Sequence, residues 1–319
     1  MVSSNISPKV PLSREGKTDS MQIVPFAGWQ KNAKLVCNDV EMIVTLEVGP
    51  RIISYGPKGG KNMLAVHEAT AGMSGQAEFH SYGGHRLWIA PEMHPRTFQP
   101  DNSPVEASEQ DDWAVFTTAT DAYHIQKEFR IKAEPEKDRF VVSHRLYNHG
   151  AYPVELAPWT PTQFATGGEC LFPQAPFIPH SEKVLPARPL VLWHYTDMSD
   201  SRWTWGKKVV RLKWEDKGPT KVGTFVDQGY AAYVLDGNTY LRRFAAIEGA
   251  NYPDGGCNFE TFSRQDMLEV ETLSPMQIVE SGAFAEHTEV WYLIPNQIPP
   301  DNDDACADWL ADLVATRPF

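Results

Sequence analysis

Apolar and polar residues alternate with a period of two through much of the chain, which is typical of β-strands with one buried face. The clearest example runs from Met267 to Leu273. One face of this strand carries Leu268, Val270 and Thr272, and the other carries Met267, Glu269, Glu271 and Leu273. The carboxylates of Glu269 and Glu271 therefore point the same way, about 7 Å apart along the strand.

Similar short patterns recur along the chain, separated by turn residues such as Asn38-Asp39 and Asp236-Gly237-Asn238. They predict strands at residues 33–37, 40–48, 52–55, 114–118, 124–132, 139–147, 154–156, 223–227, 231–235, 240–246, 259–262, 267–273 and 286–293. Prolines between residues 173 and 189 rule out long central strands there.

One amphipathic helix is predicted at residues 303–315, where Asp303 and Asp304 favour the N-terminus. Many short strands and almost no helix predict an all-β sandwich or barrel. We expect residues 1–20 to be a flexible arm and residues 21–319 to form a single domain, because all-β domains often exceed 200 residues.

Composition narrows the possible partners. Of the 319 residues 42% are hydrophobic and 11% aromatic, which is ample for a core. The net charge of −12 excludes nucleic acid and anionic membrane as electrostatic partners and suits a neutral small molecule. The N-terminus lacks an apolar signal core and no apolar run reaches membrane-span length, so the expected location is the cytoplasm. Composition does not indicate the oligomeric state.

Metal and cofactor sites are not indicated by any spacing. The cysteines Cys37, Cys170, Cys257 and Cys306 are far apart, which favours free buried thiols. Histidines do not occur at metal-ligand spacing, and no phosphate loop, dinucleotide fingerprint or nucleophile elbow is present. We therefore expect no bound metal, nucleotide or other cofactor.

The carboxylate pair Glu269 and Glu271 is the first candidate for chemistry. Like charges at close range raise one pKa, which suits a carboxylate for general acid–base catalysis. Alternatively, the pair lines a solvated sheet face, as most strand carboxylates do.

The segment from Gly83 to Glu92 is the second candidate. Its two glycines permit close approach of a ligand or a sharp bend. Arg86 offers a planar set of donors for vicinal hydroxyls or a carboxylate, Trp88 could stack on a sugar face, and Glu92 could accept from hydroxyls. Alternatively, Arg86 pairs with Glu92 and Trp88 fills the core.

Three histidines are candidate donors or acid–base groups. His85 lies inside the glycine-rich segment and His80 lies shortly before it. His144 falls on a predicted strand and is more simply explained as a core residue with its hydrogen bonds satisfied.

The late strands resemble the C-terminal end of galactose mutarotase-like proteins, the aldose 1-epimerase superfamily. The resemblance consists of a strand ending in Val270-Glu271, a loop closed by Gly282, and a strand containing Thr288-Glu289-Val290-Trp291. The family places its catalytic base on such a strand, and Glu271 stands at the matching position. The strand at Asn258-Phe259-Glu260 offers an alternative match.

Two earlier segments extend the resemblance. Arg86 resembles the family's ligand-binding arginine, and His80 lies where the family's cleft histidines occur. A strand ending in Asn148, followed by Val154–Leu156, matches the approach to the family's catalytic histidine, but Trp159-Thr160 stands in its place. His80, His85 or His144 would then supply the acid.

The resemblance spans roughly residues 33–294 and implies a large antiparallel β-supersandwich. It implies an aldose 1-epimerase-like enzyme acting on a small carbohydrate, with Glu271 and His80 as catalytic residues. The substrate-binding residues would be Arg86, His85, Trp88, Glu92, Trp159 and Glu269. The alternatives are a non-catalytic carbohydrate-binding protein and an accessory domain related to lyases or hydrolases.

Overall fold

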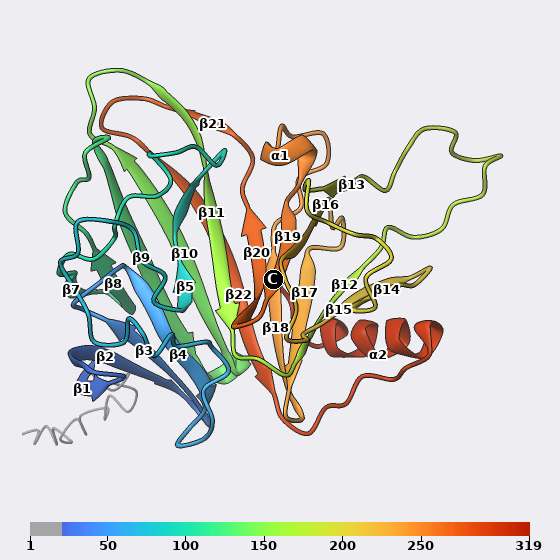
Figure 1. Ribbon diagram of the computed structural model, residues 1–319, viewed down its shortest axis with the longest axis horizontal. Coiled ribbons are helices and arrows are strands. Elements are labelled where there is room, and N and C mark those ends of the chain that lie inside the picture. The colour runs from blue at the N-terminus through green and yellow to red at the C-terminus, as the bar shows by residue number, and fades with distance from the viewer. Residues whose placement is uncertain (1–20) are drawn as a thin grey trace, which may run out of the picture.

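A computed structural model describes residues 21–319, and the expected arm at residues 1–20 lies outside the described part. Figure 1 shows two large sheets that face each other, with one helix of more than a single turn at the C-terminal end. Every strand pair is antiparallel. The predicted β-sandwich with a C-terminal helix is confirmed. Among residues 21–319 no helix is long and apolar enough to cross a membrane.

One sheet has twelve strands. In spatial order it contains β1 (Gln22–Phe26), β2 (Trp29–Cys37), β3 (Val40–Thr45), β4 (Arg51–Pro57), β5 (Gly84–Arg86), β11 (Val154–Phe164), β20 (Met267–Leu273), β19 (Phe259–Arg264), β16 (Thr220–Thr224) and β13 (Leu190–Leu192), with β6 (Trp88–Ala90) and β21 (Gln277–Val279) also paired to β11.

The other sheet has ten strands. Their spatial order is β14 (Trp203–Trp205), β15 (Val209–Lys213), β12 (Glu169–Pro173), β17 (Tyr230–Leu235), β18 (Asn238–Phe244), β22 (Phe284–Ile294), β10 (Arg139–Asn148), β9 (Ile125–Glu134), β8 (Trp113–Thr117) and β7 (Glu106–Gln110). A short helical turn, α1 (Pro253–Gly256), precedes β19, and a 3₁₀ turn (Pro135–Lys137) joins β9 to β10.

Helix α2 (Asp303–Ala315) has the predicted boundaries. The Asn302 side chain accepts a hydrogen bond from the Ala305 backbone N–H at 3.0 Å and caps its N-terminus. Its buried residues are Cys306, Leu310 and Leu313, which pack against residues of the ten-stranded sheet, outside the main core. The main core fills the space between the two sheets.

Strand β20 shows the predicted division between its two faces. Leu268 and Val270 join the core between the sheets, and Thr272 contacts His287 of the opposite sheet. Glu269 and Glu271 are carried on the other face, which points away from the second sheet. This outer face of the twelve-stranded sheet is where the candidate site lies.

Strand β11 continues well past the predicted end at Leu156 and contains two prolines. Pro161 lies where the pairing of β11 passes from β6 to β5, and no partner in either strand faces it. A residue without an N–H is tolerated at such a gap because no ladder hydrogen bond is lost. The same continuation places Trp159 and Gln163 on the outer face.

Candidate functional site

A cavity of about 400 Å³ opens on the outer face of the twelve-stranded sheet. Strands β5, β6, β11, β16, β19 and β20 supply its floor, and the segments that follow β13 and flank β5 and β6 supply its walls. Its lining residues are Phe79, Ser81, Arg86, Trp88, Glu92, Phe98, Trp159, Gln163, Trp193, Tyr195, Lys221, Phe262, Arg264, Met267 and Glu269.

The floor contains one row of residues in register across four strands. Lys221 of β16 pairs with Phe262 of β19, which pairs with Glu269 of β20, which pairs with Gln163 of β11. All four line the cavity. A cation, an aromatic ring, a carboxylate and an amide therefore lie side by side, about 4.8 Å apart from strand to strand.

Glu269 presents one free carboxylate oxygen to this row. Its Oε1 accepts hydrogen bonds from the Arg86 guanidinium at 3.1 Å and the Gln163 amide at 2.9 Å. Its Oε2 has no hydrogen-bond partner within residues 21–319. The carboxylate is thus held in place by one oxygen while the other is free to accept from a ligand.

Arg86 is packed as well as paired. Its guanidinium lies 4.0 Å from the centre of the Trp88 ring and 5.8 Å from that of Phe79. Burial lowers the pKa of Arg86, and Glu269 and Glu271 act in the opposite direction. The alternative pairing of Arg86 with Glu92 is not the one observed, because Glu92 lies exposed at the cavity rim.

Beneath the cavity, Lys221 is held between two carboxylates. Its Nζ lies 2.7 Å from Glu260 Oε2 and 3.1 Å from Glu271 Oε2, and both glutamates are completely buried. Burial raises the pKa of each glutamate, and Lys221 opposes that rise. The pKa of Lys221 is also raised, because the two carboxylates outweigh its own burial.

Tryptophans enclose this cluster. The Lys221 ammonium lies 4.8 Å from the centre of the Trp159 ring and 4.7 Å from that of Trp193. The Trp159 Nε1–H donates to Glu271 Oε2 at 2.8 Å. Trp159 and Trp193 also line the cavity, so the same rings that cover the ion cluster present flat apolar faces to a ligand.

The structure brings together five of the eight predicted site residues. Arg86, Trp88, Glu92, Trp159 and Glu269 all line the cavity. Glu271 is carried on the same sheet face but does not line the cavity, because Trp159 and Lys221 cover it and donate to its Oε2. His80 is flanked by two lining residues, Phe79 and Ser81, but is not itself one of them.

His85 lies on the opposite side of the sheet from the cavity. It is completely buried, and its Nε2 lies 2.7 Å from His144 Nε2 in the core. Neighbouring residues of a strand point to opposite faces, so Arg86 and His85 cannot both face the cavity. His144 is the buried, hydrogen-bonded core residue that the sequence favoured.

Among residues 21–319 one group could hold a metal ion by position, namely His85, His144 and Glu289. Hydrogen bonds already occupy these side chains. His144 Nδ1 donates to the His287 carbonyl oxygen at 2.9 Å, so His144 Nε2 is an acceptor. His144 Nε2 accepts from His85 Nε2, and His85 Nδ1 accepts from the Thr162 hydroxyl at 2.7 Å. Glu289 pairs with Arg242 at 3.1 Å. The donors fit a metal-free polar network.

Sequence reasoning missed Lys221, Gln163, Trp193 and Tyr195 as lining residues. Lys221 fell outside the predicted strand at residues 223–227, whereas β16 spans Thr220–Thr224. Gln163 lay beyond the predicted end of β11. Trp193 and Tyr195 belong to an aromatic run after the proline-rich stretch. That run was the one feature of the sequence that could have indicated these two lining residues.

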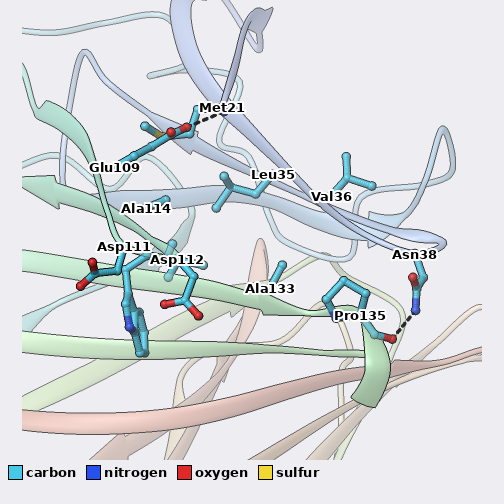
Figure 2. A pocket seen from close by; sticks show the side chains of 12 residues that line it. Met21, Leu35, Val36, Asn38, Glu109, Asp111, Asp112, Ala114, Ala133 and Pro135 are labelled. Carbon is cyan, nitrogen blue, oxygen red and sulfur yellow. Dashed lines mark hydrogen bonds between the residues drawn. The ribbon is translucent and has the colours of Figure 1, made fainter. Parts of the chain in front are cut away.

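A second cavity, of about 300 Å³, lies where β2 approaches β7, β8 and β9. Figure 2 shows Glu109, Asp111 and Asp112 among its residues, with Asn38 donating to the Pro135 carbonyl oxygen. It contains none of the predicted site residues. Trp113 is its single aromatic lining residue, so it offers less for stacking than the first cavity.

Comparison with known proteins gives matches by structure alone. No family model matches the sequence, and no curated protein matches it. A proposed aldose 1-epimerase from Klebsiella pneumoniae is similar with a TM-score of 0.59 at 10% identity, covering 93% of this chain and 87% of that one. A galactose mutarotase-like protein from Lactobacillus casei is similar with a TM-score of 0.51 at 10% identity, covering 82% and 100%.

The Slr1438 protein from Synechocystis is similar with a TM-score of 0.56 at 10% identity, covering 87% of this chain and all of that one. At identities this low, the structural similarity establishes the fold alone. The chemistry has to be argued from the residues of the site. The chain is a divergent protein of the galactose mutarotase-like fold, as the resemblance of its late strands predicts.

Proposed function

We propose that this protein is carbohydrate-active, binding an aldose in the cavity above β11, β19 and β20 and interconverting its anomers by acid–base catalysis. The observation that carries the proposal is the unequal hydrogen bonding of the two carboxylate oxygens of Glu269. One of its oxygens is fixed by Arg86 and Gln163, and the other is free at the cavity surface. A positioned carboxylate with a free oxygen can accept a proton from the anomeric hydroxyl.

The cavity suits a neutral sugar. Trp159, Trp193 and Trp88 supply apolar faces, and Glu269 and Glu92 supply acceptors for hydroxyls. Each cation that lines it already has a carboxylate partner: Arg86 has Glu269, Lys221 has Glu260 and Glu271, and Arg264 has Asp266 at 2.7 Å.

This proposal gives Glu269 the role of base, whereas the resemblance implies Glu271. Glu271 is completely buried, and its Oε2 is bound by Trp159 and Lys221. We assign it to holding these two side chains in position. His80 and His85 have no part in the proposed reaction, because neither lines the cavity.

A sugar-binding protein without catalysis is the second candidate. It is favoured by Trp159, which stands where the family has a histidine and which faces the cavity as a stacking surface. Both candidates require the same cavity and differ only in whether a proton is transferred.

The test combines binding with polarimetry. A panel of aldoses is screened by thermal shift, because a ligand that binds the folded state raises its melting temperature. The sugar that binds is dissolved as its pure α-anomer and its rotation is followed with and without protein. Glu269→Gln should slow the reaction about 100-fold or more, whereas Glu280→Gln on an exposed loop should not change it. Wild-type protein that binds no aldose would refute the proposal.

A further inference from the structure

Lys221 has a donor that the protein does not use. A lysine ammonium carries three N–H groups. Lys221 donates a hydrogen bond to Glu271 and forms an ion pair with Glu260, and residues 21–319 contain no further acceptor for it. Lys221 nevertheless lines the cavity, with 6% of its side chain exposed. A ligand atom would reach the remaining N–H from the cavity, between the Trp159 and Trp193 rings that flank the ammonium.

The other cations of the cavity cannot act as proton donors. Arg86 and Arg264 carry guanidinium groups, which do not release a proton in proteins. No histidine lines the cavity within the described residues. The Tyr195 phenol lies at the cavity wall, outside the sheet, and burial raises its pKa to about 12. The pKa of Lys221 is raised as well, so position and not acidity favours Lys221, which lies in the same register row as Glu269.

Lys221 and Glu269 stand on either side of one aromatic residue. Phe262 lies between them in the same register row, so their backbones are about 10 Å apart. A pyranose ring placed over Phe262 would have the free oxygen of Glu269 at one edge and the free N–H of Lys221 at the other. Anomer interconversion requires a base and an acid at two such positions.

We propose that Lys221 is the general acid of this site, protonating the ring oxygen of the bound aldose, and that Glu260 is a positioning residue for Lys221. The inference rests on the proposed function and adds the group that the missing histidine leaves unassigned.

The reaction balances without a co-reactant. Glu269 takes the proton of the anomeric hydroxyl, a C1=O1 double bond forms, and the C1–O5 bond breaks with its electron pair going to O5. O5 takes a proton from Lys221 Nζ. After rotation about C1–C2, O5 attacks the other face of C1 and returns its proton to Lys221, and O1 regains its proton from Glu269. The protein ends in the state in which it began.

The carboxylates of Glu260 and Glu271 support the role of Lys221 as general acid. They keep Lys221 charged and oriented while the site is at rest, so positive charge is already in place when negative charge develops on O5. The titratable groups that face Lys221 are Glu260 on β19, Glu269 and Glu271 on β20, and Tyr195 in the segment after β13.

The test compares three variants with the sugar that wild-type protein binds. Lys221→Met should slow mutarotation about 100-fold or more. It should leave the dissociation constant, followed by tryptophan fluorescence, within about ten-fold of the wild-type value. Lys213→Met, at an exposed position of β15 outside the cavity, should retain the wild-type rate. Glu260→Gln removes one counter-charge, so the high-pH limb of kcat should move down by about one pH unit or more.

Each outcome separates this inference from the proposed function. If Lys221→Met binds the sugar and accelerates mutarotation like wild type, the inference fails and the proposed function stands. If wild-type protein binds the sugar but does not accelerate mutarotation, the proposed reaction fails and the acid role fails with it. If Lys221→Met does not fold, the Glu260→Gln profile decides, and a high-pH limb that coincides with that of wild type overturns the inference.

Discussion

Replacing Glu289 by glutamine should destabilise the protein more than any conservative change on its surface. Glu289 and Arg242 are both completely buried between the sheets, with Oε1 and the guanidinium Nη1 3.1 Å apart. Thr160 also donates to Oε1 at 2.7 Å, and the Trp291 Nε1–H donates to Oε2 at 2.7 Å. The variant keeps the shape of the side chain but leaves the Arg242 charge buried without a counter-charge.

The expected loss is about 4 kcal/mol, since breaking a buried ion pair from one side costs about 3–5 kcal/mol. Unfolding entropy near 60 °C is about 2.1 cal/mol/K per residue, so a chain of this size should lose about 6 °C in Tm. Scanning calorimetry at pH 7.5 would measure this loss.

Glu286→Gln is the matched control, because it lies on the same strand and its side chain is 39% exposed beside Arg145. An exposed pair of this kind is worth at most about 1 kcal/mol. The double variant Arg242→Met/Glu289→Gln should lose about 2 kcal/mol less than the two single losses together. Equal Tm losses for Glu289→Gln and Glu286→Gln would refute the assignment of Glu289 as a buried counter-ion.

Three further predictions concern pH, backbone and ligand contact. Burial lowers the pKa of His85, His144 and His287, that of His287 to about 4, so these residues take up protons near pH 6.5 only when unfolded. Stability should therefore fall as pH drops from 6.5 towards 4, by about 3 kcal/mol for His287 alone; urea midpoints of His287→Gln should show a shallower pH dependence than wild type, and those of the exposed His149→Gln should not. Gly84 has φ of +70° and an added Cβ would overlap the Ile52 carbonyl oxygen, whereas Gly59 has φ of +67° and open space around it. Gly84→Ala should thus lower the urea midpoint clearly more than Gly59→Ala, and equal effects would contradict the close approach. Trp193→Ala should weaken aldose binding about ten-fold, or about 1.4 kcal/mol, by fluorescence titration, and unchanged affinity would exclude a stacking role for this ring.

Much of this fold could be predicted because strand alternation is a local property. The faces of β20 and the limits of α2 follow from side-chain pattern and capping residues a few positions apart. The same rule also separates Arg86 from His85, which occupy adjacent positions of β5 and point to opposite faces. This constraint on adjacent strand positions is already present in the sequence and excludes one of the two residues from the cavity.

The composition of the cavity depends on pairing between distant strands, which a single sequence does not contain. The contact between Lys221 of β16 and Glu271 of β20 depends on the strand order of the sheet, in which β19 alone separates these two strands. Whether a carboxylate on the outer face is open or covered likewise depends on Trp159, more than 100 positions earlier in the chain. A local pattern can identify the face of Glu269 and Glu271, but it cannot tell which of the two is accessible.

The strands beneath the cavity carry essential polar contacts on both surfaces. On β20, Glu269 and Glu271 serve the outer side, while Thr272 bonds to His287 on the inner side, one residue away. Any shift of this strand would disturb the cavity and the buried network together, so its positions have little freedom to vary independently. Adaptation to a new ligand would therefore have to proceed through the wall segments, where Phe79, Trp193 and Tyr195 line the cavity from outside the sheet. Substitutions should therefore be tolerated less in the strands of the cavity floor than in the wall segments.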